Sequence, residues 1–226
     1  MQKPHQICDR VYMVGGPDIT DGRDCCVYLV DGGEELALID SGLGYSCQEI
    51  LNNITKMGLD ISLLKFVLAT HGHIDHIGGL HYLQSRGIKV ACHELEKDAI
   101  AEGLSYLTAE AYYGVKYKPV SIDVVLSGDT PDLHVGDLIL RCPLTPGHTP
   151  GGISPYLDID GTRILFGQDI HGPFDDSWGS DMVKWEASMN MLLGLNADIL
   201  CEGHFGVYRP ASQVRKYIER HMRYYI

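Results

Sequence analysis

Three histidines and an aspartate lie within residues 71–76, which read His-Gly-His-Ile-Asp-His. They directly follow the nearly unbroken apolar run 63–69, which predicts a strand buried on both faces of a sheet. In an extended loop His71 and His73 point to the same side and can share one metal ion, while Asp75 and His76 can reach a neighbouring ion. Imidazole and carboxylate ligands suit zinc and similar metals, so the segment predicts a metal site rather than a polar turn or a pH-sensitive histidine patch.

Three later segments share one design, in which an apolar strand runs into a short glycine-bearing loop that presents a single metal-ligand side chain. They are residues 144–148 with His148, 164–169 with Asp169 and 199–204 with His204. Taken alone, these side chains read equally well as a turn residue, a helix cap and a surface histidine. Because ligands collect at the carboxyl ends of strands, the joint pattern predicts that the loops converge on one rim. Asp40 follows the strand 36–39 in the same way and is expected to hydrogen-bond a ligand histidine.

Short strands and helices alternate along the rest of the chain. The predicted strands are 11–14, 25–30, 36–39, 63–69, 88–92, 124–126, 138–142, 152–157, 163–166 and 198–201, and the predicted helices are 46–57, 77–84, 94–102, 186–195 and 212–223. Two strand-rich halves, each with helices, predict two packed sheets covered by helices, in a single domain of residues 1–226. The tyrosine-rich stretch 103–119 lacks clean periodicity and is interpreted as a possible lid insertion.

The formal net charge of -12, with no lysine-arginine run, would repel nucleic acid and an anionic membrane surface, so the expected partner is a small-molecule substrate. No apolar run reaches the length of a membrane span, and residues 1–16 hold no stretch of signal-peptide type. The seven cysteines include no CxxC pair, which favours a reducing compartment over a disulfide framework. We therefore expect a cytoplasmic protein, with a homo-oligomer as an open alternative.

With these residues in this order, the chain resembles the metallo-β-lactamase superfamily, whose HxHxDH pattern matches residues 71–76 without a gap. The later ligands of the family match His148, Asp169 and His204, its early acid matches Asp40, and the resemblance covers nearly the whole chain. It implies an α/β fold of the αββα type, a sandwich of two mixed β-sheets flanked by helices. It also implies that one metal ion is held by His71, His73 and His148, that a second is held by Asp75, His76 and His204, and that Asp169 bridges them.

The resemblance further implies a hydrolase that uses a hydroxide bridging two divalent metal ions, with Zn2+ expected first and Fe or Mn as alternatives. Asp75 and Asp169 would be its catalytic residues. The motifs look most like those of glyoxalase II-like and lactonase-like members, so the expected substrate is a small thioester, lactone or ester. Only about one helix follows His204, whereas glyoxalase II has a helical extension that helps to bind glutathione. The alternative is an iron-dependent oxidoreductase similar to persulfide dioxygenases, which use the positions of His71, His148 and Asp169 for one iron.

Four further residues are interpreted as a substrate rim. Tyr113 lies in the insertion, Phe174 and Trp178 lie in the loop 172–182, and His171 follows Asp169 by two residues. Packing of the aromatic side chains onto the sandwich, and a plain loop histidine, are equal alternatives. A scaffold protein on a decayed hydrolase fold is disfavoured, because decay would show as lost ligands and none is lost.

Overall fold

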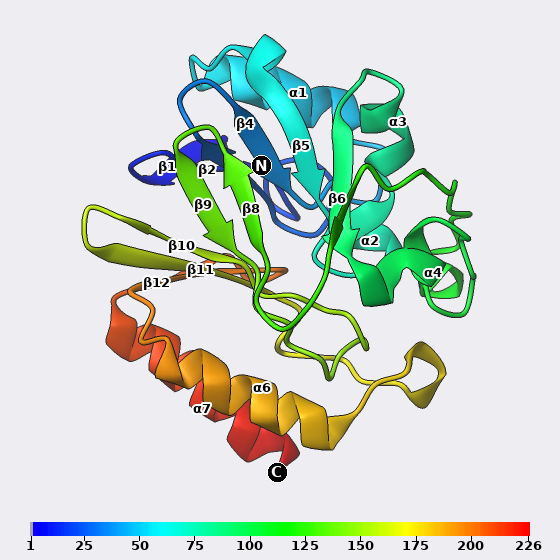
Figure 1. Cartoon of the computed structure of the whole chain (residues 1–226), viewed down its shortest axis with the longest axis vertical. Helices are drawn as coiled ribbons and strands as arrows, with labels where there is room; N and C mark the ends of the chain where they lie inside the picture. Colours follow the sequence, from blue (N-terminus) through cyan, green and yellow to red (C-terminus); the bar gives the residue numbers. More distant parts are fainter. Residues whose placement is uncertain (1) are drawn as a thin grey trace.

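Two mixed β-sheets stack face to face in the computed structural model, which describes residues 2–226 (Figure 1). The seven-stranded sheet contains, in spatial order, β1 (His5–Cys8), β2 (Val11–Gly15), β3 (Val27–Asp31), β4 (Leu36–Ile39), β5 (Leu64–Leu68), β6 (Lys89–His93) and β7 (Val124–Leu126). The six-stranded sheet contains β13 (Val207–Tyr208), β12 (Ile199–Glu202), β11 (Thr162–Gln168), β10 (Tyr156–Ile159), β9 (Leu138–Arg141) and β8 (Asp132–Val135). Pairing is parallel from β4 to β7 and between β11 and β12, and antiparallel between the other neighbours.

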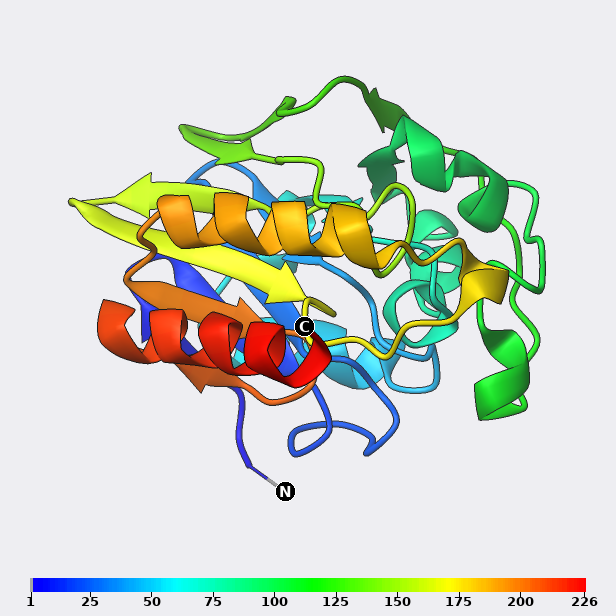
Figure 2. The same cartoon turned by 90° about the horizontal axis from the view of Figure 1, so that it is seen from below.

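Helices cover both outer faces of the pair of sheets. On the side of the first sheet lie α1 (Cys47–Lys56), α2 (Ile74–Ile77), α3 (Leu80–Gln84) and α4 (Lys97–Ile100). The short helix α5 (Glu110–Tyr113) lies against α2. Across the second sheet lie α6 (Met182–Gly194) and α7 (Ala211–Tyr225), side by side (Figure 2). Short 3-10 turns occupy Ile61–Leu63, Glu94–Glu96 and Asp176–Trp178. Among the described residues, no helix combines the length and apolar character needed to cross a membrane.

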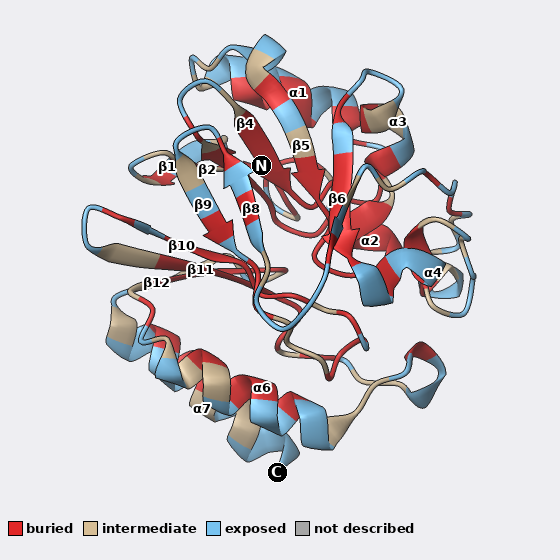
Figure 3. Cartoon of the chain, in the orientation of Figure 1, coloured by how far each residue is buried: buried red, intermediate tan, exposed pale blue. Residues whose placement is uncertain are grey.

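The core is divided into layers by the alternation of side chains along each strand. Tyr28 of β3 points between the sheets, where its ring lies 5.6 Å from that of Phe166. Its neighbour Leu29 points the other way and packs in the same cluster as Ile54 of α1. A third cluster joins the outer face of the second sheet to α6 and α7, so the central strands are buried on both faces (Figure 3). The predicted αββα sandwich of two mixed sheets is therefore confirmed.

Two predicted strands begin later than their apolar runs. The run 25–30 yields β3 only from Val27, because the backbone amides of Cys25 and Cys26 donate to other loops. Their acceptors are the backbone carbonyls of Asp75 and Gly203, at 3.3 and 2.6 Å. These two bonds tie the start of the strand to two ligand-bearing loops. The run 152–157 pairs as β10 only from Tyr156, and the earlier part forms one isolated bridge between Leu144 and Ile153.

Two helices begin earlier than predicted. The helix α6 starts at Met182 because the Asp181 side chain caps it, accepting hydrogen bonds from Val183 and Lys184 amides at 3.0 Å each. The helix α2 starts at Ile74, inside the histidine segment, with extended His73 as its first flanking residue. The strands β1, β8 and β13 were not predicted at all.

The insertion 103–119 is anchored to the sandwich by one of its tyrosines. The Tyr117 side chain is buried, and its hydroxyl donates to the Ile100 carbonyl at 3.1 Å. Its amide donates to Glu110 at 2.9 Å, which closes the segment around α5. Tyr106 and Tyr112 of the same segment are exposed.

Candidate metal centre

Every predicted ligand lies in a loop or turn that follows a strand. His71 and His73 follow β5, and Asp75 and His76 lie on α2, the next turn of chain. His148 lies in the loop between β9 and β10, while Asp169 and His204 follow β11 and β12. Because β5 and the pair β11 and β12 end at the same rim of the sandwich, the structure brings all seven side chains together, as the repeated strand-to-loop design predicted.

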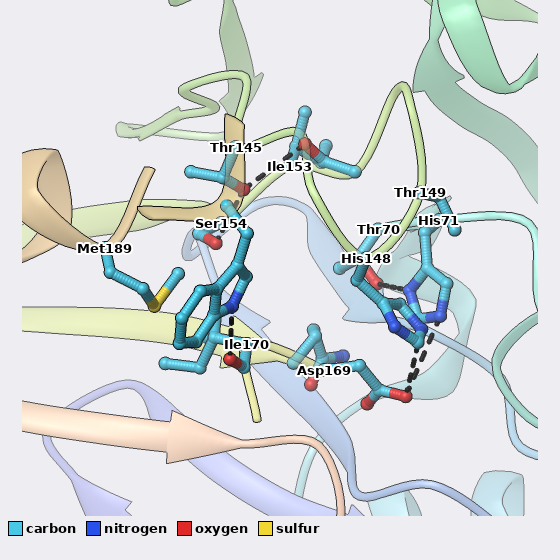
Figure 4. Close-up of a pocket in the computed structure, with 14 residues that line it drawn as sticks. Thr70, His71, Thr145, His148, Thr149, Ile153, Ser154, Asp169, Ile170 and Met189 are labelled. Carbon is cyan, nitrogen blue, oxygen red and sulfur yellow. Dashed lines mark hydrogen bonds and ion pairs between the residues drawn. The ribbon is translucent and has the colours of Figure 1, made fainter. Parts of the chain in front are cut away.

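The first group, here called the histidine cluster, consists of His71, His73, His148 and Asp169. One ligand atom from each lies within 4.8 Å of the others. His148 Nε2 lies 2.8 Å from His73 Nδ1. The same Nε2 lies 3.5 Å from Asp169 Oδ2, and His71 Nε2 lies 3.9 Å from that Oδ2 (Figure 4). All four side chains are buried, so they converge on a point screened from solvent.

The second group, here called the aspartate cluster, consists of Asp75, His76, Asp169 and His204. Asp169 Oδ1 lies 3.2 Å from both His76 Nε2 and His204 Nε2, and Asp75 Oδ2 lies 3.5 and 3.3 Å from the same two atoms. Asp169 therefore presents Oδ2 to the histidine cluster and Oδ1 to the aspartate cluster.

Several buried polar atoms of these clusters have no hydrogen-bond partner. They are Nε2 of His71, His73 and His76, Oδ2 of Asp75 and Oδ1 of Asp169. A buried polar atom without a partner costs about 1–3 kcal/mol, so a folded chain does not gather five of them without compensation. Divalent metal ions would provide it, because neutral imidazole and carboxylate are their usual protein ligands. The residues present thus fit a site for divalent metal.

The two clusters differ in protonation. Burial lowers the pKa of His71 and His73 well below the usual range and that of His148 to about 4, so the histidine cluster is neutral and ready to bind metal. Burial acts the same way on His204, but the Asp169 carboxylate outweighs it and raises the pKa of His204 to about 9. His76 also has a raised pKa, since Cys25 and the carboxylates around it overcome its burial.

Asp40 lies beneath the aspartate cluster and is completely buried. Its Oδ2 accepts from His76 Nδ1 at 2.6 Å, from the Thr70 hydroxyl at 2.8 Å and from the Gln168 side-chain amide, while Oδ1 accepts from the Thr70 amide at 2.8 Å. The bond to Nδ1 leaves Nε2 of His76 directed at the cluster. This is the contact to a ligand histidine that the sequence predicted for Asp40.

Two buried glutamates that the sequence analysis did not single out fasten the ligand loops. Glu96 accepts from the Thr149 hydroxyl and the Gly151 amide at 2.7 and 2.8 Å, beside His148. It also lies against Gly72, where an added Cβ would meet Glu96 Oε2 at 2.9 Å and Ala99 Cβ at 2.4 Å. A glycine between the first two ligand histidines is therefore required by close packing.

Glu202 fastens the loop of the last ligand. Its Oε2 accepts from the amides of His204 and Phe205 at 2.7 Å each, and its Oε1 accepts from the Tyr217 hydroxyl at 2.8 Å and from His171 Nδ1 at 2.6 Å. Although burial opposes protonation, this hydrogen bond to Glu202 raises the pKa of His171. In the sequence, one feature pointed to a role for Glu202 at the site: it precedes the ligand His204 by two residues.

Two cavities adjoin the clusters. The inner cavity, of about 20 Å3, lies behind His71 and His148 against Trp185 and Met189 (Figure 4). It has room for about one water molecule and none for a substrate. The outer cavity, of about 600 Å3, opens in front of both clusters and falls in the size range of small-molecule sites.

The outer cavity includes three of the four predicted rim residues. Tyr113, His171 and Trp178 line it together with ligands of both clusters, and the Trp178 ring lies 4.6 Å from that of His73. Phe174 is not among its lining residues within the described range 2–226. The Phe174 ring instead packs 5.3 Å from Trp185 and 4.8 Å from Tyr225, where it closes the end of the third core cluster.

The fold and the ordered ligand set define a class of protein, and comparison with known families gives the same class. Residues 20–204 match the model of the metallo-beta-lactamase superfamily, so the chain belongs to that superfamily. Among curated proteins it is 28% identical over 185 residues to the probable metallo-hydrolase YybB of Bacillus subtilis, covering 78% of this chain and 79% of that one. It is 26% identical to the human acyl-coenzyme A thioesterase MBLAC2, covering 72% of this chain and 63% of the relative. Among solved structures, a B3 metallo-β-lactamase described as having an active-site glutamic acid superposes with a TM-score of 0.82 at 26% identity, covering 99% of this chain and 88% of the other.

Proposed function

We propose that the protein is a dinuclear metal-dependent hydrolase that cleaves a small thioester, lactone or ester. One observation carries the proposal: two clusters of unpartnered ligand atoms share Asp169 at the floor of a substrate-sized cavity. The histidine cluster would hold one ion and the aspartate cluster the other. Zinc is the metal we propose, since imidazole and carboxylate are its usual protein donors. Manganese and iron accept the same donors and are the alternatives.

Divalent ions held by the two clusters would supply Lewis-acid chemistry, which would lower the pKa of a bound water and polarise a carbonyl oxygen. The protein's own residues hold the reacting groups in place and accept the proton. His76 and His204 hold the pKa of the Asp169 carboxyl well below its usual range, against the effect of burial, so this residue stays ionised. Asp75 Oδ2 is buried beside the cavity without a hydrogen-bond partner, and burial raises the pKa of Asp75. Because Asp75 Oδ2 would hold an ion of the aspartate cluster, the other carboxyl oxygen of Asp75 is the one we propose to take the proton that the water loses.

The relatives support this class of reaction. One is named a probable metallo-hydrolase and another an acyl-coenzyme A thioesterase. A thioester needs no protonated leaving group at neutral pH, because a thiolate leaves readily. The absence of a serine or cysteine nucleophile in the described lining of the outer cavity agrees with attack by water.

The competing hypothesis is a single-iron oxidoreductase that acts on thiols. Such a site would need only the positions of His71, His148 and Asp169. The aspartate cluster keeps Asp75, His76 and His204 within ligand distance of one another, which supports the dinuclear proposal.

We also propose a cytoplasmic setting, because all seven cysteines are free thiols.

The test is a hydrolysis screen on the zinc-reconstituted protein, with thioesters, lactones and aryl esters of small acids. We expect turnover that is lost in Asp169→Asn, in which the shared carboxylate is replaced by an amide. An inactive, zinc-loaded wild-type protein would contradict the proposal. Iron-dependent oxygen consumption with a persulfide would favour the competing reaction instead.

A further inference from the structure

The walls of the outer cavity are largely apolar. Tyr112 and Tyr113 come from α5, Trp178 from the loop before α6, and Phe205 from the turn that carries the last ligand. The side chains of Tyr112 and Phe205 are 70% and 59% exposed, although both are large and aromatic. Exposed aromatic side chains at the mouth of a cavity are typical of a surface that an apolar ligand covers.

The same walls offer an anion no lysine or arginine among the described lining residues, and His171, whose pKa is raised, is already paired with the buried Glu202 carboxylate at 2.6 Å. Arg23 follows the lining residue Gly22, but its guanidinium is paired with Asp21 at 2.9 Å and lies over the Tyr45 ring. Lys116 of the insertion lines a separate surface depression. With a net charge of -12 on the whole chain, an anionic arm of a substrate would meet repulsion rather than a partner.

From these two observations we infer that the enzyme acts on substrates whose acyl group is apolar and whose thiol or alcohol portion carries no ionised group before cleavage. The inference rests on the proposed hydrolase function and narrows it. Only the reacting carbonyl meets charge, at the metal clusters, and the rest of the substrate lies against aromatic walls. Coenzyme A and glutathione thioesters are therefore poor substrates, because their phosphates or carboxylates would remain without a cationic partner.

The experiment compares thioesters with one acyl group and different thiols. Butanoyl and hexanoyl thioesters of N-acetylcysteamine, glutathione and coenzyme A are given to the zinc-loaded full chain, and thiol release is measured at constant ionic strength. We expect kcat/KM for the N-acetylcysteamine ester to exceed the others at least about tenfold, the discrimination that one missing charged hydrogen bond gives. Each added methylene of the acyl group should raise kcat/KM roughly fourfold, as expected for burial of apolar surface. Equal or faster cleavage of the coenzyme A or glutathione ester would overturn the inference.

A matched pair of variants tests whether the missing cation is the cause. Tyr112→Lys places a positive charge at the mouth of the outer cavity and should raise kcat/KM for the coenzyme A ester relative to the neutral ester. Tyr106→Lys makes the same change at a tyrosine of the same insertion that is 57% exposed and lines the separate depression instead. It should leave the ratio unchanged. An equal effect of both variants would mean that overall charge, and not the cavity, sets the preference.

A binding measurement separates this inference from the proposed function. The chain has two tryptophans, and of these Trp178 lines the outer cavity while Trp185 is buried in the core. In the hexanamide analogues an amide replaces the thioester, so they resist hydrolysis. The analogue of the uncharged N-acetylcysteamine ester should quench the tryptophan fluorescence of the wild type. It should not quench the fluorescence of Trp178→Phe. If no ester is cleaved but the neutral analogue binds more tightly than the coenzyme A analogue, the proposed function fails and the selectivity stands. If the charged analogue binds as tightly, the selectivity fails.

Discussion

Asp40 gives the sharpest test of how the scaffold prepares the metal centre. We expect Asp40→Asn to lower the affinity for zinc about 10- to 100-fold, the usual effect of losing a hydrogen-bond partner of a ligand histidine. Asp40 has a positive φ of 62°, and asparagine adopts that conformation as readily as aspartate does. The substitution therefore keeps the backbone and the side-chain shape, and changes the charge and the hydrogen bonding of this side chain.

The size of the effect on stability follows from the donors around the carboxylate. Three of them converge on Oδ2, from His76, Thr70 and Gln168, and the Thr70 amide donates to Oδ1. Asparagine offers one accepting oxygen, so its NH2 group must face a donor whichever way the amide turns. One such mismatch costs about 1–3 kcal/mol of stability. A 10- to 100-fold loss of zinc affinity corresponds to about 1.4–2.7 kcal/mol and is a separate effect, because it arises only from the lost contact that orients His76.

The assay is competition for zinc with a chromophoric chelator, together with urea unfolding of the metal-free protein. Asp24→Asn is the matched control, because Asp24 is 1% exposed and accepts from the Thr20 hydroxyl and the Leu43 amide at 2.6 and 2.8 Å, outside both clusters. It should lose stability and keep its zinc affinity. Equal zinc affinity in Asp40→Asn and Asp24→Asn would refute the reasoning, since Asp40 would then be only a structural residue.

Three further predictions concern protonation, the last ligand loop and the rim. Because the pKa of His204 is raised to about 9 and that of His76 is also raised, both are protonated in the metal-free protein at pH 7, and binding of the second zinc must release protons. The zinc affinity of the aspartate cluster should therefore rise with pH up to about 9. The zinc affinity of the histidine cluster should change little above pH 6.5. Calorimetry in buffers of different ionisation enthalpy measures the protons released in each case. Glu202→Gln replaces one of two accepting oxygens by a donor, and we expect urea unfolding to show a loss of about 2 kcal/mol and cobalt spectra to show a disturbed site at His204. Trp178→Ala should change substrate preference without changing metal content, and loss of folding instead would make Trp178 a core residue.

The ligand set could be predicted because each ligand stands at a fixed place after a strand. Strand periodicity is a local property, and the repeated strand-to-loop design of His148, Asp169 and His204 favoured convergence on one rim, while their assignment to two metal ions came from the family resemblance. The same logic identified Asp40 beneath them. The early start of the helical segment at Ile74 escaped prediction, because the four residues of α2, Ile74–Ile77, are too few to show a helical period.

The buried glutamates could not be predicted for a different reason. In sequence, Glu96 lies in a polar stretch that reads as a solvated helix, yet the structure buries it completely between two ligand loops, where burial raises the pKa of Glu96 to about 7. Glu202 lies in an apolar strand and reads as its exposed end. Whether such a carboxylate faces solvent or a ring of amide donors depends on loops distant in sequence, which no local pattern records. Phe174 shows the converse, since an aromatic side chain in a predicted rim loop is half-buried and packs against the edge of the third core cluster.

The central claim is that two metal ions share Asp169, and elemental analysis tests it most directly. Protein purified without added metal, with and without exposure to air, is analysed for metal per chain. The account predicts about two zinc or manganese ions per chain, falling to about one in His204→Ala, which removes a ligand of the aspartate cluster alone. A single iron per chain in the wild type, or no metal even after reconstitution, would contradict it.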